Sequence, residues 1–160
     1  MKRSKRSSEI SDAAYKADPE TKGLTMKDKL RLCQALTYFL VKFEPGTLDL
    51  AKFSEALGLN AEALERFGTE CTLEIGRNSF FQPDINEMLR VTLKDLLGKE
   101  RILSDLKRKY RLDYSLERVP VLYADGKIQN QRLSLDDDIL AFMYLSGTHD
   151  DLDYFIFPEE

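Results

Sequence analysis

The side chains best suited to chemistry gather near the C-terminal end of the sequence. His149, the one histidine of the chain, stands beside Asp150, Asp151 and Asp153. In an extended strand Asp151 and Asp153 would project from the same face, where they could hold a divalent cation or serve a hydrolytic reaction. Calcium sites need about six oxygen ligands around a tight turn, and zinc sites need several His or Cys ligands. The segment supplies neither set, so a solvated strand entry is the favoured interpretation and a metal-dependent or hydrolytic enzyme is the alternative.

A run of three aspartates, Asp136, Asp137 and Asp138, is the second conspicuous group. Ser134 is a typical helix N-cap residue, and Asp137 three residues later completes a capping box. Carboxylates in a first helical turn are also stabilised by the helix dipole, by roughly 0.3–1 kcal/mol each. Capping therefore accounts for the run, and an interaction surface stays open in addition. The candidate acidic binding surface comprises Asp136, Asp137, Asp138, Asp150, Asp151 and Asp153.

Nucleophilic catalysis would have to use Cys33 or Cys71 with His149 as the base. Both cysteines are expected in buried segments without a CxxC spacing, which is typical of reduced structural thiols in a cytosolic protein. The sequence contains no P-loop, GxGxxG, GxSxG or HExxH motif. No catalytic residue is therefore assigned. Carboxylate pairs across the sheet stay open as a further alternative, in which one of three residues would face Asp153: Glu74, Asp113 or Glu117.

Charge is unevenly distributed along the 160 residues, whose net charge is −4. Residues 1–29 have a basic excess, whereas the residues after Arg132 include eight carboxylate side chains and no lysine or arginine. This balance does not favour nucleic-acid binding, although the basic start MKRSKR could contact phosphate groups or anionic lipid. No stretch is long and apolar enough for a membrane span or a signal peptide. We therefore expect a cytoplasmic protein that interacts with no membrane.

The apolar pattern predicts one domain preceded by a tail. Residues 1–25 lack apolar periodicity and are interpreted as flexible, whereas residues 26–160 can bury a core without disulfides, metals or cofactors. The order of elements predicts an α+β fold, a small antiparallel or mixed sheet of about four strands with helices packed on one face. The expected strands are 32–43, 71–75, 112–123 and 151–157, and the expected helices are 50–57, 61–67, 83–97, 100–110 and 135–146.

Two of these elements lead to more specific predictions. In residues 112–123 the apolar side changes phase near Pro120, which indicates a bulged edge strand. In residues 135–146 the helical spacing predicts a stripe that faces the core. That stripe comprises Leu135, Ile139, Leu140, Phe142 and Met143.

The C-terminal two thirds of the chain also show a familiar order of motifs. A Leu-rich helix pair and a strand are followed by Leu133-Ser134-Leu135 at a helix start and by Asp151-Leu152-Asp153-Tyr154 in a closing strand. In this order the chain resembles the bacterial domain-of-unknown-function family numbered 4279, over roughly residues 32–157. The resemblance implies a fold more than an activity, because that family has no agreed biochemical role.

These observations together favour a non-enzymatic protein-interaction module. No assembled catalytic site is visible, and the acidic C-terminal part of the chain could attract a basic protein partner. An immunity-type or inhibitor protein is the most concrete version of this expectation, because an acidic single domain can neutralise a basic partner through electrostatic steering. The partner itself and the oligomeric state are not predicted.

Overall fold

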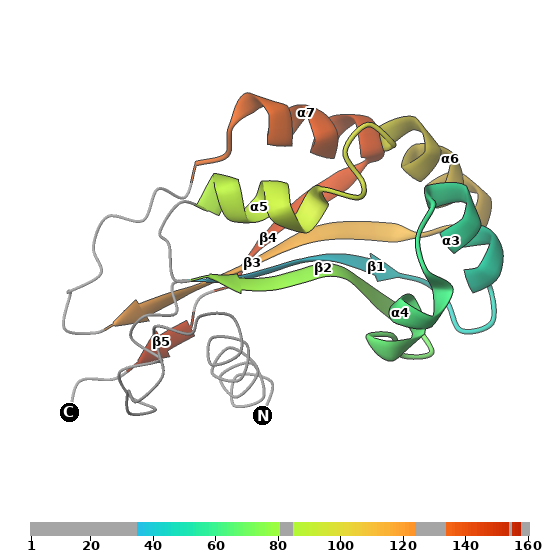
Figure 1. Cartoon of the computed structure of the whole chain (residues 1–160), viewed down its shortest axis with the longest axis horizontal. Coiled ribbons are helices and arrows are strands. Elements are labelled where there is room, and N and C mark those ends of the chain that lie inside the picture. Colours follow the sequence, from blue (N-terminus) through green and yellow to red (C-terminus); the bar gives the residue numbers. More distant parts are fainter. Residues whose placement is uncertain (1–34, 81–84, 124–133, 154, 158–160) are drawn as a thin grey trace.

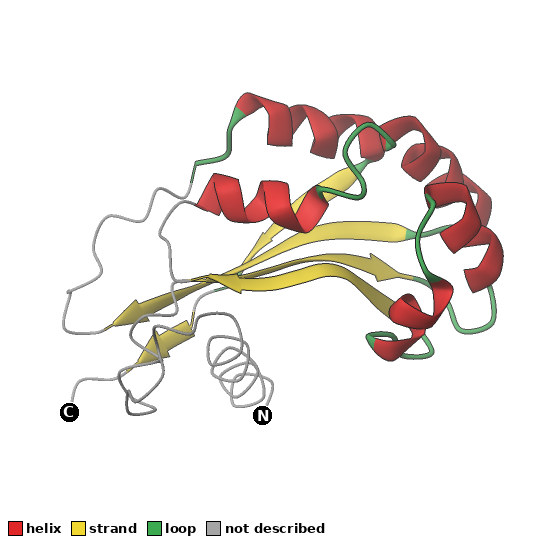
Figure 2. Ribbon diagram, in the orientation of Figure 1, coloured by secondary structure: helices red, strands yellow, loops and turns green. Residues whose placement is uncertain are grey.

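The computed structural model describes residues 35–80, 85–123, 134–153 and 155–157, which form one sheet with helices on one face (Figures 1 and 2). The predicted α+β class is confirmed. The predicted tail at residues 1–25 lies outside the described residues. The strands are β1 (Ala35–Lys42), β2 (Thr72–Phe80), β3 (Asp113–Tyr123), β4 (Thr148–Leu152) and β5 (Phe155–Phe157), and the helices are α3 (Leu50–Leu57), α4 (Ala61–Arg66), α5 (Ile85–Leu93), α6 (Glu100–Tyr110) and α7 (Asp137–Ser146).

The sheet is mixed and has the strand order β2-β1-β3-β4. β1 pairs antiparallel with both β2 and β3, whereas β4 and β5 pair parallel with successive parts of β3. In Figure 1, α5, α6 and α7 lie over one face, and α3 and α4 pack at one end of the sheet. β3 therefore lies inside the sheet, with β1 on one side and β4 on the other.

The interior position of β3 corrects the prediction of a bulged edge strand. Its pairing with β1 runs without a shift from Pro120 opposite Ala35 to Asp113 opposite Lys42. All side chains from Tyr114 to Val119 are buried, which means that both faces of the strand are covered at this point. A strand buried on both faces need not alternate apolar with polar residues. The apparent change of phase in the sequence is a consequence of that double burial.

Two further strand predictions are corrected in their limits. The C-terminal strand expected over residues 151–157 is two short strands, β4 and β5, which both pair with β3. The strand expected to end at Ile75 continues to Phe80, because Gly76 forms an irregularity within β2 instead of ending it. Gly76 has φ +68°. Because α5 lies close to it, a Cβ atom at this position would be 2.0 Å from the carbonyl oxygen of Thr92.

The core lies between the sheet and the helices, and aromatic rings occupy its centre. The Phe39 ring of β1 lies 5.2 Å from that of Tyr114 in β3 and 6.1 Å from that of Phe142 in α7, measured between centroids. The Tyr114 hydroxyl donates to the Leu103 carbonyl oxygen at 2.8 Å, and burial raises the pKa of Tyr114. Burying each large apolar side chain contributes roughly 1.5–3 kcal/mol. The three rings thereby fix α7 and α6 to the middle of the sheet.

Local caps set the start of α3 and of α4. Asp49 caps α3, since its carboxylate accepts the Lys52 N–H at 3.1 Å. Thr47, two residues earlier, donates its hydroxyl to the Glu44 carbonyl oxygen. Asn60 caps α4 by accepting two backbone N–H groups. Both caps satisfy donors that a helix N-terminus otherwise leaves unpaired.

Candidate protein-interaction surface

The candidate aspartates lie in two groups, one at the start of α7 and one in β4 and just beyond it. The first group, residues 136–138, stands at the N-terminus of α7, and the second comprises Asp150, Asp151 and Asp153. The chain reverses at Gly147, and β4 then runs back beneath α7 (Figure 1). A helix of 10 residues and a strand of five have similar lengths, about 15 and 17 Å. The first acidic group therefore stands at the start of α7, and the second lies in the second half of β4 and just beyond it.

Arg90 of α5 binds two aspartates of the first group. Its Nε atom donates to Asp138 Oδ2 at 3.0 Å, and its Nη2 atom donates to Asp136 Oδ2 at 2.5 Å. Glu87, one turn earlier on α5, accepts from Nη1 of the same guanidinium at 2.5 Å. The hydrogen bonds from Arg90 lower the pKa of Asp138, and the aspartates raise the pKa of Arg90. Asp136 and Asp138 thus connect α7 to α5.

The N-terminus of α7 differs from the predicted capping box. The helix begins at Asp137 and its N-cap residue is Asp136, which makes no side-chain capping bond. Asn86 of α5, which is buried, takes part instead: its Oδ1 atom accepts the Asp136 N–H at 2.8 Å, and its Nδ2 atom donates to the Ser134 carbonyl oxygen at 3.0 Å. The predicted Ser134 cap is wrong because a residue from another helix satisfies the backbone at this position.

Arg118 of β3 engages the second acidic group. Its side chain is only 4% exposed, and it donates from Nε to Asp150 Oδ1 at 2.8 Å and from Nη2 to Asp150 Oδ2 at 2.5 Å. Such a bidentate pair fits the planar guanidinium and carboxylate groups. Asp153 lies just past the end of β4, and its N–H donates to the Arg118 carbonyl oxygen at 2.9 Å. Asp150 is therefore a structural partner of β3.

The surroundings of His149 bear on the alternative enzymatic interpretation. His149 Nδ1 lies 3.5 Å from Asp113 Oδ1, and both side chains are about half exposed. β4 ends at Leu152, so Asp151 and Asp153 do not share one strand as expected. Within the described ranges, no group of three or more His, Cys, Asp or Glu side chains is arranged to hold a metal ion. The structure brings His149 together with Asp113.

The remaining candidates for catalysis are distributed over the sheet. Glu117 lies opposite Asp151 in the β3–β4 register, so both are on one face, and Glu117 accepts a hydrogen bond from Ser115 at 2.8 Å. Cys71 is exposed, which corrects its predicted burial, and it immediately precedes β2. β2 and β4 are separated by two strands, so Cys71 does not meet His149. Cys33 lies outside the described residues, and Glu74 belongs to β2, away from Asp153.

The outward side of α7 is apolar although it faces solvent. We call this side, formed by Leu140, Ala141, Tyr144 and Leu145, the α7 surface. Tyr144 is 86% exposed, Leu145 is 58% exposed and Leu140 is 47% exposed. The prediction that Leu140 faces the core is therefore wrong, because Ile139, Phe142, Met143 and Ser146 provide the buried side of the helix. A helix that is apolar on all sides normally has partners on more than one side.

The sequence identified the acidic residues of this region but not the two arginines that form ion pairs with them. Arg90 and Arg118 lie far from their aspartate partners in the sequence, and no spacing signal connects them. The α7 surface could have been recognised, since the residues after Asp138 include no charged side chain up to Ser146. From the sequence, the apolar residues of this helix were interpreted only as one side facing the core, and not as a second, exposed apolar side.

Comparisons with known proteins identify no relative: no family model, no curated protein and no solved structure matches this chain. None of the helices in the described part of the chain has the length and apolar character that crossing a bilayer requires.

Proposed function

We propose that this protein is a non-enzymatic binding module that recognises a basic protein partner through the α7 surface and the carboxylates beside it. The observation that carries the proposal is the exposure of Leu140, Tyr144 and Leu145 on one helix. Contiguous apolar side chains on a surface are typical of sites that a partner covers. Tyrosine in particular is enriched where protein interfaces gain most of their binding energy.

Charge next to the α7 surface supports a basic partner. Among the described residues, four carboxylates and one guanidinium stand around the N-terminus of α7, so this group is negative even after pairing. Asp137 has no ion pair with another described residue, which leaves it available for a ligand. Asp151 is unpaired among these residues too, but it lies on the sheet face turned away from α7. Negative charge around an apolar centre increases the rate of association with a basic protein. The group at the helix N-terminus comprises Glu87, Asp136, Asp137, Asp138 and Arg90.

An inhibitor of the immunity type is the narrower form of this proposal. Such a protein would mask a basic toxic partner by covering its functional surface, and it would need an exposed anchor together with complementary charge. The α7 surface supplies the anchor through Tyr144, and the neighbouring aspartates supply the charge. This form predicts that the partner loses its activity when the complex forms.

The test is quantitative co-purification of the tagged full-length chain from its native cells. One variant, Leu140→Ser/Tyr144→Ser, removes the apolar contact, and a second, Asp137→Lys, reverses the available charge beside it. Asp136 is left intact because it binds Arg90. The control, Glu62→Lys, makes the same change of charge at an exposed position of α4.

The expected result is a basic protein that co-purifies in stoichiometric amount with the wild type and with the control. Both α7 variants should lose it, and wild-type binding should weaken as salt is raised because charge steers the encounter. A partner retained by both α7 variants would contradict the proposed surface. The absence of any stoichiometric partner from every preparation would contradict the proposed function.

A further inference from the structure

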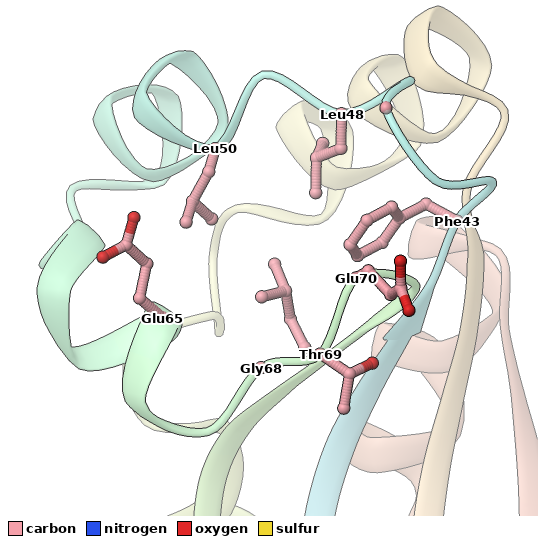
Figure 3. A pocket seen from close by; sticks show the side chains of 9 residues that line it. Phe43, Leu48, Leu50, Glu65, Gly68, Thr69 and Glu70 are labelled. Carbon is pink, nitrogen blue, oxygen red and sulfur yellow. The ribbon is translucent and has the colours of Figure 1, made fainter.

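A separate cavity of about 330 Å³ lies where α3 and α4 pack against the ends of β1 and β2. This volume is within the range of small-molecule sites and has room for roughly ten water molecules. Figure 3 shows the side chains of Phe43, Leu48 and Leu50 turned toward this space. The described residues that line the cavity are Phe43, Gly46, Leu48, Leu50, Glu65, Gly68, Thr69, Glu70 and Leu73.

Local backbone contacts fix the wall of the cavity. Gly68 forms a β-bridge with Leu73, and a Cβ atom at Gly68 would lie 2.8 Å from the Leu73 Cδ2 atom. The Thr69 hydroxyl accepts the N–H groups of Cys71 and Thr72 at 3.2 and 3.0 Å, which holds the turn that enters β2. The cavity is therefore bounded by a defined turn, which a ligand could meet without first ordering it.

The chemistry of the lining is apolar at the centre and negative at the sides. Glu65 and Glu70 are exposed, and within the described part of the chain neither carboxylate forms an ion pair or a side-chain hydrogen bond. In Figure 3 the Glu65 carboxylate lies on the side of Leu50 and the Glu70 carboxylate on the side of Phe43. None of the described residues that line the cavity is a lysine, arginine or histidine. A positively charged ligand would thus meet no competing cation among them.

We propose that this cavity binds a small organic cation, a protonated amine attached to an apolar body. The apolar body would fill the space between Phe43, Leu48 and Leu50, and the ammonium group would lie near Glu65 or Glu70. The Phe43 ring adds a face that attracts a cation, because aromatic rings have negative charge density above their plane. A neutral molecule of the same shape would retain only the apolar contact, and an anion would be repelled.

The experiment compares three probes of similar size: 2-phenylethylamine, 2-phenylethanol and phenylacetate. Each is titrated into the isotopically labelled full-length chain, and the backbone amide signals of Thr69 and Leu73 are followed by NMR. A Glu65→Gln/Glu70→Gln variant removes the charge at the cavity with little change of shape. The matched control is Glu55→Gln/Glu62→Gln, at exposed positions of α3 and α4 that do not line the cavity.

The amine should bind saturably at these signals and at least about tenfold more tightly than the alcohol, given the gain from cation–π and ion-pair contacts. The cavity variant should lose this preference, and the control should keep it. An unchanged amide spectrum across a full amine titration, or equal affinity for the amine and the alcohol, would overturn the proposal. Because the site is independent of the α7 surface, the Leu140→Ser/Tyr144→Ser variant should bind the amine as the wild type does.

Discussion

Asp150 and Asp151 are neighbours in β4. Of these two residues, only Asp150 forms an ion pair with another described residue. Alternation along the strand places Asp150 on the face of Arg118 and Asp151 on the opposite face. The same contrast exists in α7, where Asp136 and Asp138 bind Arg90 and Asp137 does not. The candidate acidic surface, which was chosen by residue type alone, therefore includes both aspartates that pair with an arginine of the fold and aspartates that can bind a ligand.

This distinction predicts different stabilities for two adjacent substitutions. Asp150→Asn leaves the buried Arg118 guanidinium without its carboxylate and should lower the free energy of unfolding by about 1–3 kcal/mol. Asp151→Asn removes an unpaired surface charge and should change it by no more than about 0.5 kcal/mol. Urea unfolding of the two variants makes the comparison. Equal effects would mean that the Arg118 contact does not stabilise the fold.

A second prediction concerns the irregularity in β2. Gly76→Ala adds a Cβ atom against the Thr92 carbonyl oxygen at a left-handed position. Left-handed strain and overpacking together should lower the free energy of unfolding by about 2–5 kcal/mol. Gly46→Ala is the control, since Gly46 has φ +80° with nothing within 4 Å of the added atom. Its cost should be about 1–2 kcal/mol, from backbone strain alone. Equal costs in chemical denaturation would show that β2 and α5 do not approach closely at Gly76.

At the scale of elements, α5 and α7 are joined by Arg90, and this contact should depend on pH. The guanidinium holds the pKa of Asp138 below its ordinary value of 3.8. A carboxyl group with a lowered pKa in the folded state stabilises the protein above its unfolded-state pKa, and this contribution is lost as pH falls toward the folded-state pKa. The stability difference between wild type and Arg90→Gln should therefore be full above about pH 4 and shrink at lower pH.

The measurement is urea unfolding of both proteins across the acid range. Arg101→Gln is a suitable control, because Arg101 of α6 is exposed and has no ion pair with another described residue. The difference in free energy of unfolding between Arg101→Gln and the wild type should not shrink below pH 4. If the Arg90→Gln difference stays constant down to the lowest pH, Asp138 is not the group that couples α5 to α7.

The exposed side of α7 leads to a further prediction at this scale. If the α7 surface serves binding and not folding, Leu140→Ser/Tyr144→Ser should change the free energy of unfolding of the isolated protein by less than about 1 kcal/mol. Phe142→Ala on the buried side should cost about 3–5 kcal/mol. Thermal and urea unfolding distinguish the two. A large loss in the surface variant would place this side of α7 within the folded core.

Which elements could be predicted depends on how local their determinants are. The sequence predicts α6 over residues 100–110 because its periodicity, the glycine before it and the basic last turn all lie within the helix or beside it. β3 was assigned to an edge because its neighbours are set by pairing with distant β1 and β4, which alternation does not encode. The cap of α7 comes from Asn86 on another helix, so no local pattern predicts it.

For the whole molecule, the layer arrangement determines where the available charge and apolar area meet. Helices cover one face of the sheet, α7 lies above β4, and Asp137 lies on the same outward side of α7 as Tyr144. The sequence indicates a negative C-terminal part but not that Tyr144 projects beside it, because burial within α7 depends on packing against α6 and β4. The cavity near Phe43 depends in the same way on packing between two separate stretches, residues 43–50 and 65–73.

The most direct test is photocrosslinking in native cells with a photoreactive amino acid in place of Tyr144. We predict one discrete adduct with a basic protein, and we predict that the adduct disappears when Asp137→Lys is added. The same amino acid in place of Glu62, on exposed α4, should give no such adduct. An identical set of adducts from both positions, or none from position 144, would contradict the account that α7 is the binding surface of this protein.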